Sequence, residues 1–85
     1  MKIDIKLFGQ AKDYFPTSHF QIMSEKESLT VAEIKMKLIS QALQPEKSRA
    51  LIEDSALATE VRVLQNHEQI TSGGVIFVLP PVCGG

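Results

Sequence analysis

The sequence has few of the residues that build metal sites, disulfide frameworks and nucleic-acid surfaces. One cysteine and no tryptophan occur in 85 residues, which excludes an intramolecular disulfide and a cysteine-rich zinc site. Nine Lys and Arg side chains are offset by ten Asp and Glu, so the formal net charge is −1. Such a chain lacks the cationic excess that displaces counterions from nucleic acid. We therefore expect neither a metal site nor a nucleic-acid partner.

Long hydrophobic runs are also missing. The longest apolar run, Val75 to Leu79, is far too short to cross a bilayer. The segment Met1 to Asp4 alternates in charge and lacks the apolar block of a signal peptide. With 44% hydrophobic residues and a length that suits one domain, we expect a cytoplasmic globular protein with no membrane contact.

Motifs of conventional catalysis are absent from the sequence. The two histidines, His19 and His67, are far apart and have no cysteine near either of them. Gly73 and Gly74 precede an apolar run that reads as a strand, whereas a phosphate-binding glycine loop precedes a helix. We therefore expect the chain to be non-catalytic on its own and to bind no cofactor.

Strict alternation of polar and apolar residues predicts a half-buried strand over Lys2 to Leu7. Its inward residues are Ile3, Ile5 and Leu7, and the same parity places Phe8 on the outward face. A short helical turn is predicted over Gly9 to Phe15. A second strand within His19 to Ser24 is expected to pair antiparallel with the first.

A helix is predicted from Thr30, because Thr30 and Glu33 have the spacing of a capping box. Its core-facing stripe comprises Val31, Ile34, Leu38 and Ala42, with Lys35 and Lys37 off the stripe. Pro45 is expected to end this pattern near Gln44. A shorter helix is predicted over Ser48 to Asp54.

The second half of the chain predicts further strands. Leu57 to Leu64 reads as one strand or two, and Gln65 to Gln69 reads as a polar loop. Ser72 to Gly74 predicts a turn that tolerates positive φ, followed by a strand over Val75 to Leu79 that is covered on both faces. The order of the predicted strands and helices along the chain predicts an α+β roll, with one main helix packed on a mixed sheet.

The C-terminal residues differ in composition from the rest of the chain. Four of the five glycines lie in the last 13 residues, and Gly84 and Gly85 end the sequence. Pro80 and Pro81 stiffen the backbone before them and supply no N–H donor, so strand pairing must stop there. We therefore divide the chain into a domain over 1–79 and an extended tail over 80–85. Such a tail can enter a narrow channel and deliver its terminal carboxylate.

Four segments carry a resemblance to a known family, namely Leu7 to Lys12, Leu29 to Glu33, Ile70 to Gly73 and the end Leu79 to Gly85. Together they resemble the MoaD/ThiS family of ubiquitin-like sulfur carriers, and within it the small subunits of molybdopterin synthase. The resemblance covers nearly the whole chain. It implies a β-grasp fold.

The resemblance also implies a sulfur relay. An adenylating enzyme of the ubiquitin-activating type (MoeB-like) would use ATP to activate the carboxylate of Gly85, and a sulfur donor would convert it to a thiocarboxylate. The tail residues would then enter the active site of the large subunit (MoaE), commonly in a heterotetramer, and sulfur would pass to cyclic pyranopterin monophosphate in molybdenum cofactor biosynthesis. These tail residues are Pro80, Pro81, Val82, Cys83 and Gly84.

A docking face is expected beside the tail. We assign Val75, Phe77 and Leu79 to the outward face of the last strand, and the alternate residues to the core. The predicted partner-docking residues are Phe8, Val63, Phe77 and Leu79.

The sequence leaves four questions open. Cys83 stands where the family commonly has a small residue, so it either contacts the partner or takes part in the chemistry. Two alternatives to molybdopterin synthase require the same activation of Gly85. They are a ThiS-like sulfur carrier for thiamin or another thio-product, and a ubiquitin-like protein modifier. The sequence leaves open which activating enzyme and sulfur donor serve the chain, and whether the isolated chain is monomeric.

Overall fold

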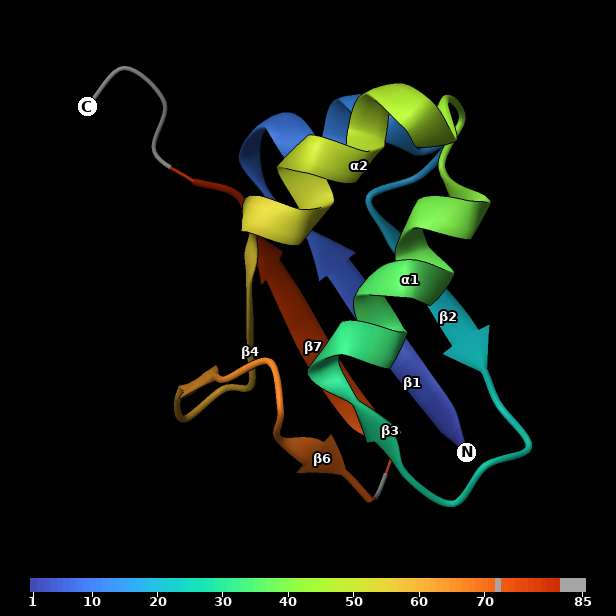
Figure 1. Cartoon of the computed structure of the whole chain (residues 1–85), viewed down its shortest axis with the longest axis vertical. Helices are drawn as coiled ribbons and strands as arrows, with labels where there is room; N and C mark the ends of the chain where they lie inside the picture. Colours follow the sequence, from blue (N-terminus) through green and yellow to red (C-terminus); the bar gives the residue numbers. More distant parts are fainter. Residues whose placement is uncertain (72, 82–85) are drawn as a thin grey trace.

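A five-stranded mixed sheet with two helices on one face forms the body of the molecule (Figure 1). The computed structural model describes residues 1–71 and 73–81. The strands run in the order β2-β1-β7-β4-β5, with β1 and β7 parallel and every other neighbouring pair antiparallel. Their bounds are Lys2–Leu7 for β1, His19–Met23 for β2, Ala56–Ala58 for β4, Val63–Leu64 for β5 and Gly74–Leu79 for β7. The predicted α+β arrangement is confirmed.

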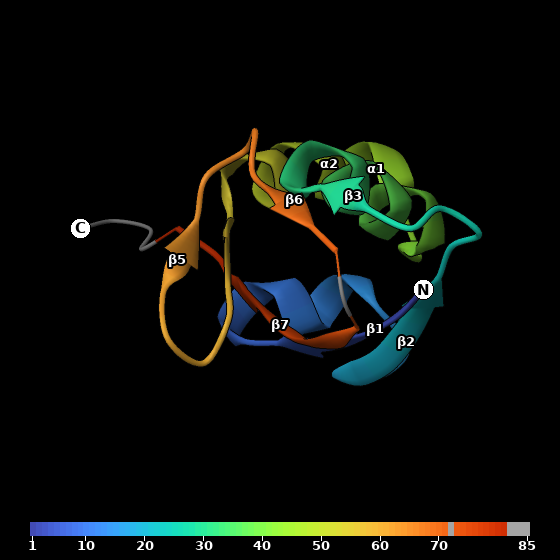
Figure 2. The same ribbon diagram turned by 90° about the horizontal axis from the view of Figure 1, so that it is seen from below.

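Two helices and one 3-10 helix complete the body. The main helix α1 spans Val31–Gln41, α2 spans Pro45–Asp54, and the 3-10 helix η1 spans Gly9–Tyr14. Viewed from below, α1 and α2 lie together above one face of the sheet (Figure 2). The other face of the sheet has no α-helix over it in the described part of the chain.

The predicted capping box at the start of α1 is confirmed. The backbone N–H of Glu33 donates to the hydroxyl of Thr30 over 3.1 Å, and the N–H of Thr30 donates to the Glu33 carboxylate over 3.0 Å. The predicted helix ends differ from those observed, because α1 ends at Gln41 and α2 already begins at Pro45. A proline fits the first turn of a helix, where its missing N–H is not needed.

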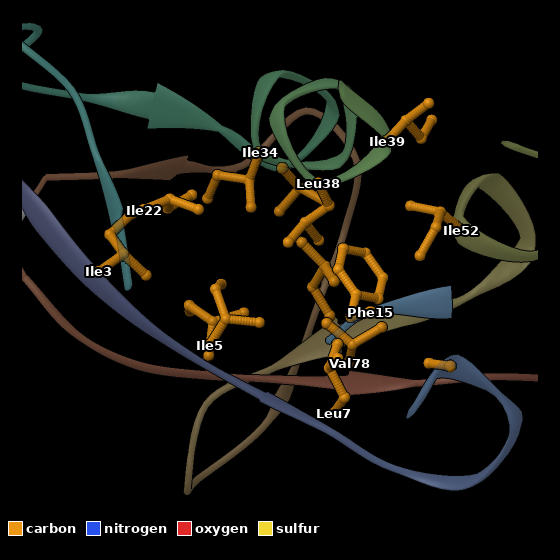
Figure 3. Close-up of a cluster of buried hydrophobic side chains, with 14 of the residues drawn as sticks. Ile3, Ile5, Leu7, Phe15, Ile22, Ile34, Leu38, Ile39, Ile52 and Val78 are labelled. Carbon is orange, nitrogen blue, oxygen red and sulfur yellow. The ribbon is translucent and has the colours of Figure 1, made fainter. Parts of the chain in front are cut away.

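The core lies between the helices and the sheet (Figure 3). The predicted inward residues of β1 are buried, and so are those of α1. Burying a Val, Leu or Ile side chain contributes about 1.5–3 kcal/mol, so the core between helices and sheet supplies most of the stability of the folded chain. Its largest fully buried members include Ile3, Ile5, Ile22, Leu29, Ile34, Leu38, Ile52 and Leu57.

Lys35 departs from the sequence prediction because it is buried, with 8% of its surface exposed. Its ammonium donates to the carbonyl of Glu53 over 3.0 Å and to the side-chain oxygen of Asn66 over 3.2 Å. Burial lowers the pKa of Lys35, while Asp54 and Glu53 oppose that shift. The long aliphatic stem can cross the helix interface while the charged end reaches acceptors, a placement that helical periodicity does not reveal.

The segment Leu57 to Leu64 is a hairpin of two strands, β4 and β5. Thr59 organises the turn, since its hydroxyl accepts from the backbone N–H groups of Val61 and Arg62. A second small sheet pairs β3, Leu29–Thr30, with β6, Gln69–Ile70. The sequence analysis missed it because a strand of two residues is too short to show alternation.

Positive φ is found at Gly9, at +57°. Gly73 is needed for space, because a Cβ there would lie 2.5 Å from the carbonyl oxygen of Lys2. A glycine lets the two backbones approach at the start of the β1–β7 pair.

Candidate functional site

An apolar row crosses the outer face of the sheet, opposite the helices. Val63 on β5 is paired with Ala58 on β4, and Ala58 is paired with Phe77 on β7. Phe77 is in turn aligned with Lys6 on β1. Paired residues share a face of the sheet, so these four side chains form one continuous row.

The predicted faces of β7 are confirmed. Ile76 and Val78 are buried against the core, whereas Val75 and Phe77 are half-buried and Leu79 is 36% exposed. Within the described part of the chain, β7 is therefore covered fully on its inner face and only partly on its outer face, whereas the apolar run predicted cover on both.

Phe8 joins this surface from the end of β1. It is 45% exposed, and its ring centroid lies 5.8 Å from that of Phe77. The ammonium of Lys6 lies 6.0 Å from the Phe77 centroid, at the limit of a cation–π contact. The structure therefore brings together the four predicted docking residues on one surface, which we call the outer apolar patch: Phe8, Val63, Phe77 and Leu79.

Sequence reasoning missed two members of the same surface, Lys6 and Ala58. The signal for Lys6 was present, since it shares the outward parity of Phe8 on the first strand. The place of Ala58 depends on the pairing of β4 with β7, which no local pattern encodes. Both residues border Phe77 in the sheet, and Ala58 is itself buried there, with 6% of its surface exposed.

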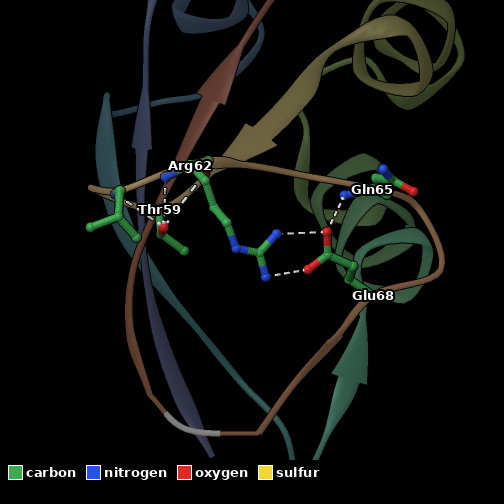
Figure 4. Close-up of polar contacts among 5 residues, drawn as sticks. Thr59, Arg62, Gln65 and Glu68 are labelled. Carbon is green, nitrogen blue, oxygen red and sulfur yellow. Dashed lines mark hydrogen bonds and ion pairs between the residues drawn. The ribbon is translucent and has the colours of Figure 1, made fainter.

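The hairpin that carries Val63 is held by an ion pair (Figure 4). Arg62 donates through both terminal nitrogens to Glu68, one of them over 2.7 Å, and the backbone N–H of Gln65 donates to the same carboxylate over 3.0 Å. These bonds hold the pKa of Glu68 down to about 2, the Arg62 bond being the larger cause. The backbone N–H of Val31 donates to the carbonyl of Glu68, which attaches the loop to the start of α1.

The chain leaves the sheet beside the outer apolar patch. Strand β7 ends at Leu79, and Pro80 follows half-buried while Pro81 is exposed. A Cβ built on Gly9 would lie 3.1 Å from the ring of Pro80, so the exit is in close contact with the end of β1. The remaining predicted tail residues lie outside the described residues: Val82, Cys83, Gly84 and Gly85.

Among residues 1–71 and 73–81, no group of three His, Cys, Asp or Glu side chains could hold a metal ion. None of the helices in this part is both long enough and apolar enough to cross a membrane. A broad hollow between Met1, Lys26 and Thr71 is polar and lies at the end of the sheet opposite Pro80.

Comparisons with known proteins were made by sequence and by structure. No protein-family model and no curated protein sequence matches the chain. Among solved structures, SAMP1 from Haloferax volcanii superposes with a TM-score of 0.76 at 15% identity, with complete coverage of both chains. A putative molybdopterin converting factor subunit 1 from Pyrococcus furiosus gives a TM-score of 0.77 at 19% identity, covering 96% of this chain and 99% of that one. The chain has the ubiquitin-like β-grasp fold.

A third similar structure is that of a complex. It contains subunits 1 and 2 of the molybdopterin-converting factor from Helicobacter pylori, with a TM-score of 0.63, 24% identity and complete coverage of both chains. At these identities the likeness establishes the β-grasp fold. The resemblance expected from the sequence is confirmed at that level.

Proposed function

We propose that this chain is the sulfur-carrying small subunit of a molybdopterin synthase. In this proposal Gly85 carries a thiocarboxylate and donates its sulfur to cyclic pyranopterin monophosphate in molybdenum cofactor biosynthesis. The observation that carries the proposal is the juxtaposition of the outer apolar patch with the exit of the chain at Pro80 and Pro81. A surface of this kind suits a domain that binds a partner while its chain end enters that partner.

The chemistry required at Gly85 is an exchange of oxygen for sulfur. A carboxylate oxygen would attack the α-phosphorus of ATP, releasing pyrophosphate and leaving an acyl-adenylate. Hydrosulfide supplied by a donor would then attack the carbonyl carbon and displace AMP, giving the thiocarboxylate and releasing a proton. A MoeB-like activating enzyme would bind the ATP and supply the catalytic groups.

The proposed partner of the outer apolar patch is the large subunit (MoaE), in a two-plus-two heterotetramer. Partly exposed aromatic side chains at the centre of a patch are typical of residues that dominate binding energy. Phe8 and Phe77 are such a pair, and Leu79 extends the patch to the point where the chain leaves the sheet. The structure of the two-subunit complex from Helicobacter pylori supports a partner of this type.

Reconstitution tests the proposal directly. The chain, an activating enzyme, ATP and a sulfide source would be incubated, and intact-mass spectrometry would look for replacement of one oxygen by sulfur at a chain that ends in Gly85. The product would then be mixed with the large subunit and the pyranopterin substrate, and dithiolene formation would be scored. A chain lacking Gly85 is the control, and it should give neither the mass change nor dithiolene.

The same experiment separates the alternatives. A ThiS-like carrier would form the thiocarboxylate but would give no dithiolene when mixed with a large subunit and the pyranopterin substrate. It would instead give thiazole when mixed with a thiamin-type acceptor. Attachment of the chain to lysines of other proteins, without a mass change on the free chain, would indicate a protein modifier. Either result would overturn the assignment to molybdopterin synthase.

A further inference from the structure

We infer that the contact between Gly9 and Pro80 sets the direction in which the chain leaves the sheet, which makes Gly9 a positioning residue for the chemistry at the C-terminal carboxylate. The inference rests on the proposed function, because it concerns how the chain end reaches an activating enzyme. The contact itself is a property of the fold and can be tested separately.

Two properties of Gly9 make it unusual. Its φ of +57° lies in the left-handed region, and a Cβ built there would lie 3.1 Å from Cγ of Pro80 and 3.9 Å from its Cδ. Gly9 is therefore the one described glycine that combines a left-handed backbone conformation with close approach to another element. A side chain at this position would have to displace the proline ring or be displaced itself.

Of the two residues in the contact, Gly9 is the one held in place by its neighbours. Gly9 begins η1 directly after β1, and the backbone N–H of Ala11 donates to the carbonyl of Phe8 over 3.2 Å. Ala11 is fully buried in the core, and the Phe8 ring lies against Phe77. Movement at Gly9 would disturb these contacts, so the proline is the partner that yields.

The Pro80 side of the contact is the one that transmits a displacement. The last aligned pair of the parallel strands is Leu7 with Val78, so strand pairing ends just before Gly9 and Pro80. Pro80 has a fixed φ and donates no hydrogen bond, and Pro81 extends the rigid segment. A stiff pair of prolines converts a small shift at the ring of Pro80 into a changed direction of the residues that follow.

A change in the exit direction should alter the rate at which the chain end is activated more than the affinity of the chain for the activating enzyme. Gly9 is not one of the residues of the outer apolar patch, so when Pro80 yields and Gly9 stays in place, the surfaces of the domain that bind partners can remain intact. A reacting group that is misplaced by about 1 Å can lose on the order of a hundredfold in rate. We therefore expect a misdirected chain end to be activated slowly at unchanged binding to the activating enzyme.

The test compares three variants of the full chain. Gly9→Asn adds a Cβ and keeps a residue type that tolerates left-handed φ. Pro80→Ala removes the ring and leaves β1 and η1 untouched. Gly74→Asn is the matched control, because a Cβ at Gly74 meets nothing within 4 Å. Circular dichroism and thermal unfolding identify the variants that are folded.

The first readout is structural. Cys83 is the only cysteine of the chain, so a nitroxide attached to it reports, by broadening of backbone amide signals, which residues lie near the tail. The pattern should change in Gly9→Asn and in Pro80→Ala and stay unchanged in Gly74→Asn. An unchanged pattern in folded Pro80→Ala would overturn the inference, even where Gly9→Asn fails to fold.

The second readout is the rate of thiocarboxylate formation by unlabelled protein at saturating activating enzyme. Gly9→Asn should be on the order of tenfold to a hundredfold slower, with a similar Kd for the enzyme. A changed broadening pattern with an unchanged rate would refute the positioning role. A wild-type chain that is never activated would instead refute the proposed function, while the nitroxide measurement would still decide the contact.

Discussion

The ring of Phe8 lies 5.8 Å from the ring of Phe77, with their planes tilted by 41°. The two residues are 69 positions apart in the sequence, and the parallel pairing of β1 with β7 brings them together. Their contact creates the centre of the outer apolar patch on a face of the sheet that no helix in the described part of the chain covers. The first prediction concerns this patch.

Replacing Phe8 by Asp should disrupt binding of the large subunit. An aspartate would place a charge at the centre of the outer apolar patch, and loss of a central aromatic contact costs about 2 kcal/mol or more, roughly a thirtyfold rise in Kd. Titration calorimetry would measure the change. Met36→Asp is the control, because Met36 is 68% exposed on α1, which lies on the other side of the sheet. Equal affinities for both folded variants would refute the docking role of Phe8.

Replacing Thr30 by Ala should lower the stability of the chain. The change removes the acceptor for the backbone N–H of Glu33 and opens the capping box. The expected loss is about 1 kcal/mol, which corresponds to a fall in Tm of about 4–8 °C for a domain of this size. Calorimetry would measure it, with Thr71→Ala as an exposed threonine control. A Tm unchanged from the wild type would contradict the assigned role of the cap.

The stability of the chain should decrease as the pH falls from about 4.5 toward about 2. Lys26 and Thr30 hold the pKa of Glu33 down to about 2, and Arg62 and the Gln65 N–H do the same for Glu68, against an ordinary value of 4.5. The unfolded chain therefore takes up protons first as the pH falls, which favours unfolding.

Urea unfolding at a series of pH values would measure this loss. In Glu68→Gln the dependence should be shallower than in the wild type, because one of the two depressed carboxylates is gone. Glu46→Gln, which removes the same charge at an exposed position of α2, should keep the wild-type dependence. High salt should reduce the effect, since both ion pairs are at the surface.

Replacing Gly73 by Ala should destabilise the chain far more than replacing Gly74 by Ala. A Cβ at Gly73 would meet the backbone oxygen of Lys2 at 2.5 Å, whereas a Cβ at Gly74 has open space. Forcing the β1–β7 pair apart at its start should cost about 1–3 kcal/mol, and the Gly74 variant should stay within about 0.5 kcal/mol of the wild type. The urea concentrations at the midpoint of unfolding would be compared for the two variants and the wild type. Two variants of equal stability would mean that the strands separate there at no cost.

Local patterns were sufficient for much of the fold. The alternation over Lys2 to Leu7 reflects a strand with one buried face, and the spacing of Thr30 and Glu33 is that of a local hydrogen-bond motif. Both were predicted correctly because the interacting groups are close in sequence. The short strands β3 and β6 escaped prediction because each is defined by its partner and not by its own composition.

The sequence alone determined the longer strands, the capped helix and the unusual composition of the last residues, since each depends on neighbouring positions. Only the tertiary structure decided that Phe8, Val63, Phe77 and Leu79 share one surface, that Lys35 is buried, and that Gly9 touches Pro80. The physical reason is the same in each case. These contacts join segments that are distant in the chain, and strand order and register, set by packing of the whole core, bring them together.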